Sequence, residues 1–147
     1  MTQVVVEVLS LVKLEDEEPL ARLLGQLSSS ATFDHDRIQA VLDHQATELL
    51  VARLDGRIVG MATLVSVPLP TGIRGHIEDV VVDQTLRGRG IARQLLETMT
   101  AMAEAQGLRT LDLTSRPSRE SALRLYESVG FKRRETNVLR YTPAETP

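Results

Sequence analysis

The sequence predicts an α/β fold with a mixed sheet of six to seven strands and four helices. Along the 147 residues, valine-rich or alternating apolar segments of strand length are interspersed with segments that carry apolar residues at helical spacing. The dipeptide Asp55-Gly56 predicts a hairpin between two of the strands. The expected elements follow the order β-α-α-β-β-β-α-β-α-β, and a mixed order of this kind indicates both parallel and antiparallel strand pairs.

The first half of the chain begins with a valine-rich strand over residues 4–12. Acidic residues open a helix over residues 15–27, where they suit the positive end of the helix dipole, and Pro19 is tolerated in its first turn. A second helix is expected to start at Asp34 or Asp36, because aspartate is a preferred N-cap. Three strands then cover residues 48–54, 57–67 and 75–82.

The second half of the chain continues with a long helix that follows residue 90. Its apolar residues repeat at helical spacing from Ile91 onward, and it ends at Gly107, where a glycine is expected. Leu111 and Leu113 alternate with polar neighbours and predict a short strand. A fourth helix follows and ends at Gly130.

One domain over residues 1–142 accounts for the chain, with one or two last strands within residues 131–141 and a disordered tail over residues 143–147. The formal net charge of −3 argues against a nucleic-acid binder. No apolar run approaches the roughly 18 residues of a membrane span, so no membrane association is expected. The N-terminus lacks the layout of a signal peptide, and a cytoplasmic location is expected.

Cysteine is absent from the chain. This excludes disulfides, thiolate metal ligands and a covalent cysteine intermediate. His35 and His44 belong to no tight cluster of histidine and acidic residues, so no metal site is expected.

One stretch between the third of these strands and the long helix is rich in glycine and arginine, and it reads Arg87-Gly88-Arg89-Gly90-Ile91-Ala92. The first N–H groups of a helix lack an intrahelical partner and point toward the positive end of its dipole. Glycines let a phosphate come close to the backbone, and arginines add charged, fork-shaped donors. The stretch therefore predicts a pyrophosphate site, although on these residues alone a solvated arginine turn is an equal alternative. A Walker loop and a dinucleotide fingerprint fit poorly, the latter because Arg93 stands where it needs glycine or alanine.

The same stretch resembles the Arg/Gln-x-x-Gly-x-Gly/Ala signature of the GNAT superfamily of acyl-CoA-dependent N-acetyltransferases. A second segment, residues 121–131, is similar to the penultimate helix and turn of that family, with an Ala-x-x-x-Tyr spacing before Gly-Phe. The strand GHIEDVVVD is similar to the corresponding strand of hexosamine-phosphate acetyltransferases. Because the order of elements also resembles that of the family, the likeness spans nearly the whole chain. It implies a GNAT-like mixed, mostly antiparallel sheet of six to seven strands flanked by four helices.

The resemblance also implies acetyl-CoA as the co-substrate and indicates which residues hold it. In this family the strand before the signature splays from the next one, and its free backbone groups bind the pantetheine arm like an added strand. Val80, Val81 and Val82 are the matching residues, and one of their N–H groups can hold the thioester oxygen as charge develops on it. Arg119 stands where many relatives have an asparagine that contacts pantetheine. Either it reaches the phosphates or adenosine of the cofactor instead, or the contact is lost.

The implied reaction is acetyl transfer from acetyl-CoA to a primary amine of a small molecule or peptide, by direct attack in a ternary complex. Tyr126 is the candidate acid that protonates the departing sulfur, and its alternative role is that of a core aromatic residue. Glu78 is the candidate base, ahead of Asp79 and His76, because a carboxylate in mid-strand is costly unless it is paired or useful. A salt bridge between Glu78 and Arg74 or another arginine, and proton transfer through water, remain alternatives.

Two further expectations concern the whole protein. A non-catalytic module that binds and senses acyl-CoA is the alternative function, since it needs the glycine-rich loop but not the tyrosine. Exposed edge strands within residues 131–141 are consistent with a homodimer.

Overall fold

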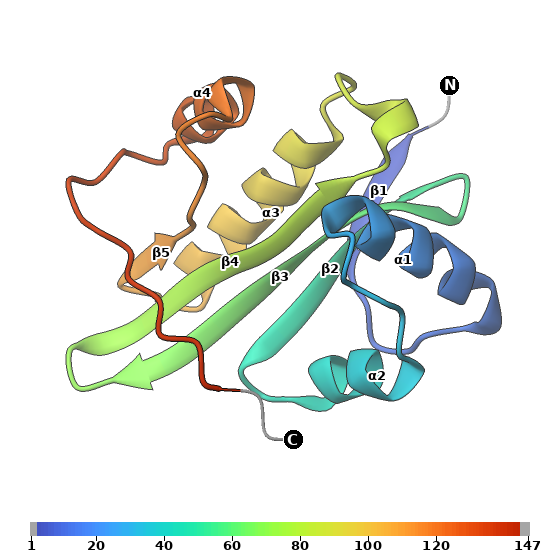
Figure 1. Ribbon diagram of the computed structural model, residues 1–147, viewed down its shortest axis with the longest axis horizontal. Helices are drawn as coiled ribbons and strands as arrows, with labels where there is room; N and C mark the ends of the chain where they lie inside the picture. Colours follow the sequence, from blue (N-terminus) through green and yellow to red (C-terminus); the bar gives the residue numbers. More distant parts are fainter. Residues whose placement is uncertain (1–2, 145–147) are drawn as a thin grey trace.

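The computed structural model describes residues 3–144, whose centre is a five-stranded sheet with the order β1-β2-β3-β4-β5 (Figure 1). The strands are β1 (Val4–Val8), β2 (Thr47–Leu54), β3 (Arg57–Leu69), β4 (Gly72–Val82) and β5 (Thr110–Asp112). The first three pairings are antiparallel, and β5 runs parallel to β4. The predicted mixed, mostly antiparallel sheet is therefore confirmed. Residues 145–147 of the tail predicted to be disordered lie outside the described residues.

Two pairs of helices cover the two faces of this sheet (Figure 1). They are α1 (Leu14–Leu27), α2 (His35–Asp43), α3 (Ile91–Ala105) and α4 (Glu120–Val129), and the short 3-10 helix η1 (Gln84–Leu86) precedes α3. Under α1 and α2 lies the α1-side core, formed by Leu9, Val12, Leu20, Leu23, Leu49, Val51, Ile58, Met61 and Val81. Under α3 and α4 lies the α3-side core, formed by Leu50, Ala52, Val59, Ala62, Leu64, Ile77, Val82, Ile91, Leu95, Leu96, Met99 and Tyr126. In the part of the chain that the structure describes, no helix is both long and apolar enough to cross a membrane.

Local sequence signals place two of these elements correctly. Asp34 is the N-cap of α2, and its carboxylate accepts a hydrogen bond from the N–H of Arg37. The turn between β2 and β3 is the predicted hairpin, with positive φ at both Asp55 and Gly56. The start of α1 differs slightly, because Lys13 caps it and Pro19 therefore lies beyond the first turn.

The prediction of strands within residues 131–141 is wrong, and the sheet has five strands rather than six to seven. This segment has no regular secondary structure, and Val138, Leu139 and Tyr141 are 73%, 91% and 88% exposed. The edge that it would extend, β5, is only three residues long and offers few ladder hydrogen bonds. The segment also opens with four consecutive charged residues, 132–135, which favour contact with water.

The outer part of β4 leaves the regular pattern of the sheet in two ways. Between the pairs Met61–Val81 and Thr63–Glu78 the register shifts by one residue, and Asp79 has a φ of 55°. This is a β-bulge, which leaves a backbone group unpaired and increases the local twist. In addition, β5 pairs with β4 only at residues 74–76, so the following residues of β4 have no strand beside them on that edge. The splay that the family resemblance implies would leave this same edge of β4 free.

A buried charge network joins α1 to the sheet. Asp16 is 1% exposed, and its carboxylate accepts hydrogen bonds from the Arg53 guanidinium at 2.8 and 3.3 Å and from the Lys13 N–H at 3.2 Å. Glu7 pairs with the same guanidinium at 2.7 Å. Burial by itself would raise the pKa of Asp16, but the hydrogen bonds from Arg53 and Lys13 outweigh it and hold the pKa below its ordinary value of 3.8.

Asp16→Asn is expected to lower the free energy of unfolding by about 3 kcal/mol at pH 7, because it leaves the Arg53 charge without its buried partner. The pKa of Asp16 is lower in the folded protein, so its stabilisation is present above the unfolded pKa and is lost as the pH falls through the folded value. Urea unfolding between pH 2 and 7 should therefore show a flatter acid limb for the variant. Glu18→Gln, which breaks only the exposed Glu18–Arg57 pair, is the control. An equally steep limb in Asp16→Asn would contradict this assignment.

Candidate active site

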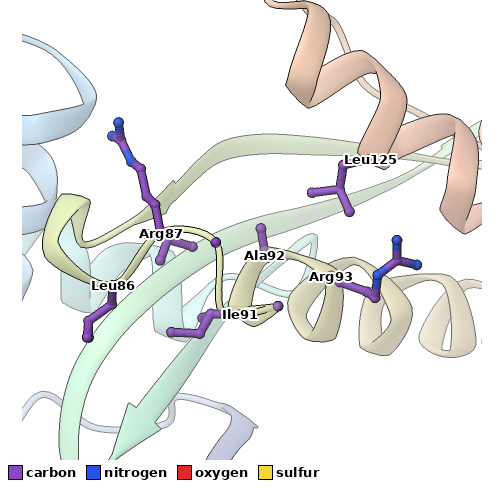
Figure 2. A pocket seen from close by; sticks show the side chains of 9 residues that line it. Leu86, Arg87, Ile91, Ala92, Arg93 and Leu125 are labelled. Atoms are coloured by element: carbon purple, nitrogen blue, oxygen red, sulfur yellow. The ribbon is translucent and has the colours of Figure 1, made fainter.

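A pocket of about 270 Å³ opens at the N-terminal end of α3 (Figure 2). The end of β4, the loop that follows η1 and the first turn of α3 form most of its wall. One side chain of α4, Leu125, closes it from the opposite side (Figure 2). The pocket therefore lies between α3 and α4, beside the end of the strand that splays from its neighbour.

The two glycines of the loop adopt a backbone conformation that other residues rarely take. Gly88 has a φ of 80° and Gly90 a φ of 78°. Space is also open around them, since no heavy atom of a non-neighbouring residue lies within 4 Å of the position of a Cβ at either glycine. The turn therefore requires the glycines, and the same open space leaves room for a ligand at the loop.

The N-terminus of α3 has free hydrogen-bond donors. Gly90 is the N-cap and makes no side-chain cap, whereas Asp34 caps α2 with its carboxylate. The first intrahelical bond of α3 runs from the Gln94 N–H to the Gly90 carbonyl, so the N–H groups before it have no partner in the helix. This helix end can hold an anion such as a phosphate, and the geometry of the loop fits the pyrophosphate of coenzyme A.

Arginines surround this helix end. Arg87 and Arg89 are exposed, and Arg87 lines the pocket. Arg93 also lines it and donates a hydrogen bond to the Ser128 hydroxyl of α4 at 2.7 Å. Arg93 therefore joins α3 to α4 across the pocket and adds positive charge to its wall.

The structure brings together six of the ten residues predicted to contact the cofactor, namely Val82, Arg87, Gly88, Gly90, Ile91 and Ala92. The other four do not line the pocket. Val80 packs against the α3-side core, Val81 belongs to the α1-side core, Arg89 is exposed, and Arg119 is the exposed N-cap of α4. The backbone of Val80 and Val81 lies on the splayed part of β4.

Glu78 lies on β4 next to the bulge, and its side chain is exposed. Gly75 and Ile77 face the α3-side core, so Glu78 and His76 share the opposite face. Within residues 3–144 no ion pair involves Glu78, and Arg74 instead donates to the Thr71 hydroxyl at 3.2 Å. The alternative of a salt bridge with Arg74 or another arginine is therefore wrong.

Tyr126 is buried, at 8% exposure, in the α3-side core. Its ring packs edge-on against Phe131, with the ring centroids 6.4 Å apart. The residue before it, Leu125, lines the pocket. The packing role considered for Tyr126 is thus present, and Tyr126 itself does not line the pocket.

The sequence did not point to three lining residues, Leu86, Arg93 and Leu125. In the sequence, Arg93 indicates only that a dinucleotide fingerprint fits poorly. Its position directly after Ala92, in the first turn of the helix, is the signal that could have identified it.

Comparisons with known proteins bear on the family and the fold. The family model described as "Acetyltransferase (GNAT) family" matches residues 10–131. Glucosamine 6-phosphate N-acetyltransferase of Trypanosoma brucei brucei is 32% identical over 146 residues, which cover 94% of this chain and 97% of that protein. A solved Trypanosoma brucei acetyltransferase is 27% identical with a TM-score of 0.77, over 95% of this chain and 100% of that one. A putative acetyltransferase from Agrobacterium tumefaciens has the same fold, with a TM-score of 0.83 at 23% identity over 94% of this chain and 99% of that one.

The family model and the Trypanosoma brucei brucei relative both match most of the chain, including the residues of the glycine-rich loop. The chain belongs to the GNAT acetyltransferase family, and it is an N-acetyltransferase that uses acetyl-CoA as its co-substrate.

Proposed function

We propose that this enzyme acetylates the primary amine of a phosphorylated amino sugar of the hexosamine phosphate kind. The observation that carries the proposal is the similarity to glucosamine 6-phosphate N-acetyltransferase, which covers 97% of that protein. The face of β4 that bears Arg74, His76 and Glu78 supports it. A carboxylate suits the amine of such a substrate, and a guanidinium four residues away suits its phosphate.

Arg74 and Glu78 lie on one face of this strand, four residues apart. Four residues of extended strand span about 13 Å between Cα atoms. The Arg74 guanidinium and the Glu78 carboxylate form no ion pair with each other. Both side chains are therefore available to a ligand.

We infer that acetyl-CoA lies along the splayed edge of β4, with its pyrophosphate at the N-terminus of α3. The backbone of Val80, Val81 and Val82 would pair with the amides of the pantetheine arm, and Arg87 would add charge near the phosphates. Arg119, exposed at the start of α4, would act on the outer, phosphate-bearing part of the cofactor. The thioester supplies an activated acetyl group and a thiolate leaving group.

The chain's own residues then handle the protons of the reaction. Glu78 accepts a proton from the ammonium form of the acceptor, so that the amine can attack. An N–H group freed by the bulge at Asp79 donates to the carbonyl oxygen on which negative charge develops. Tyr126 donates a proton to the departing sulfur. The new C–N bond replaces the C–S bond. The nitrogen then loses its second proton, which restores the neutral Tyr126, and the proton on Glu78 passes to water, so that the products are the acetamide and coenzyme A.

The acceptor is tested by following the release of coenzyme A with a thiol reagent, which has no background here because the chain contains no cysteine. Glucosamine 6-phosphate, unphosphorylated glucosamine and a short peptide with a free N-terminus are compared. The phosphorylated sugar is expected to have a kcat/KM about 100-fold above that of glucosamine, since a charged hydrogen-bonding pair is worth about 3 kcal/mol. Arg74→Gln should remove most of this preference and leave glucosamine itself unaffected. A preference for the peptide would identify a peptide N-acetyltransferase instead and would contradict the proposal.

A further inference from the structure

Two polar side chains of α1 reach the segment that leads into the cofactor loop. Arg22 and Gln26 are four residues apart and therefore share one face of the helix. The Arg22 Nε donates to the Asp83 Oδ2 at 3.0 Å, and its Nη2 donates to Oδ1 at 3.4 Å. The Gln84 N–H donates to the Gln26 Oε1 at 2.9 Å. These bonds join residues about sixty positions apart, so no local sequence pattern predicts them.

Asp83 is the centre of this arrangement. It follows the last residue of β4, and its side chain is 11% exposed. The carboxylate also accepts from the N–H of Thr85 at 3.1 Å and from its hydroxyl at 3.0 Å. Thr85 belongs to η1, and the next two residues, Leu86 and Arg87, line the pocket. The position of this part of the pocket wall thus depends on α1.

Asp83 also adds a negative charge just before the loop. A carboxylate close to an anion site repels a phosphate unless a cation neutralises it. The hydrogen bonds from Arg22 hold the pKa of Asp83 well below its ordinary value, against the opposing effect of burial, and Asp83 in turn raises the pKa of Arg22. The pair therefore stays doubly ionised at neutral pH. Without Arg22, the start of the loop would carry an uncompensated negative charge.

We propose that Arg22 and Gln26 are positioning residues for acetyl-CoA, which hold the loop through Asp83 and Gln84 without touching the ligand. The inference rests on the proposed placement of the pyrophosphate at this loop and is independent of the identity of the acceptor. It connects a helix on one face of the sheet to a pocket on the other face. It also explains why a buried carboxylate is tolerated so close to a site for phosphate.

The test measures acetyl-CoA binding by calorimetry and steady-state kinetics on the full chain. Arg22→Gln is expected to raise both the Kd and the KM for acetyl-CoA about tenfold, and kcat at saturating acetyl-CoA should stay within about twofold. Arg22→Lys should recover a large part of the affinity, because the charge is kept. Gln26→Ala removes only the bond to the Gln84 N–H and should weaken binding about threefold.

Arg57→Gln is the matched control, because it breaks an ion pair with Glu18 on the same helix that does not touch the loop. It should leave the affinity for acetyl-CoA unchanged. The inference is overturned if Arg22→Gln and Gln26→Ala both bind acetyl-CoA as tightly as the wild type, even if their melting temperatures fall. Weaker binding by both, with normal binding by Arg57→Gln, supports it whichever acceptor the enzyme uses. A wild type that acetylates no amino sugar phosphate but binds acetyl-CoA would contradict only the proposed acceptor.

Discussion

Gly90→Glu is expected to abolish measurable acetyl-CoA binding while the protein remains folded. The new carboxylate would sit at the N-cap of α3, where it accepts the free N–H groups itself and repels the pyrophosphate. The loss of two charge-assisted hydrogen bonds costs about 3 kcal/mol or more, which is at least about a 100-fold loss of affinity. Wild-type protein at about 100 times its Kd for acetyl-CoA should be stabilised by about 2.7 kcal/mol, and this shift should disappear in the variant.

The control for this variant is Gly56→Glu. Gly56 lies in the β2–β3 hairpin with a φ of 82°, and it too has open space around its Cβ position. The substitution therefore introduces the same charge and a similar backbone strain of about 1–2 kcal/mol. Its unfolding free energy should fall by a similar amount, but acetyl-CoA should bind normally. If Gly90→Glu binds acetyl-CoA as the control does, the glycines form only a turn and the cofactor lies elsewhere.

Tyr126→Phe is expected to lower kcat about 100-fold and to leave the Kd for acetyl-CoA unchanged. The phenylalanine keeps the ring in the α3-side core and against Phe131, so the packing and the stability should change little. What it removes is the hydroxyl proposed to protonate the departing sulfur, and general acid catalysis of this kind contributes about 100-fold or more. Rates of coenzyme A release at saturating substrates measure the effect.

The second tyrosine of the chain provides the control. Tyr141 is 88% exposed, and Tyr141→Phe removes a hydroxyl outside the site. It should turn over like the wild type. Unchanged turnover in Tyr126→Phe would rule out the acid role and leave Tyr126 as a core residue, with the sulfur protonated by another group or by water.

Glu78→Gln in the same assay tests the base, and a lowered kcat with normal acetyl-CoA binding is the result expected from the proposal.

Much of the fold could be predicted because its signals are local. The Asp55-Gly56 turn, the Asp34 cap and the glycine after α3 each act through hydrogen bonds or backbone angles within a few residues. The strands expected within residues 131–141 failed for the opposite reason. Whether a strand forms there depends on a partner edge, and β5 is too short to provide one.

The candidate site divides in the same way. The residues from Arg87 to Ala92 form one contiguous stretch, so a phosphate site could be predicted from their residue types and spacing. Most of them line the pocket. Leu125 joins them only because α4 packs beside α3, and no local pattern encodes that contact.

By itself, the sequence determined the family and the position of the glycine-rich loop, and the lack of cysteine excludes a thiol intermediate, since these follow from residue types and short spacings. Only the tertiary structure decided that Glu78 is exposed and forms no ion pair with Arg74, that a bulge interrupts β4 at Asp79, and that Arg22 pairs with Asp83 before the loop. Burial, strand register and pairs between distant residues arise from the packing of the whole chain, and no short segment specifies them.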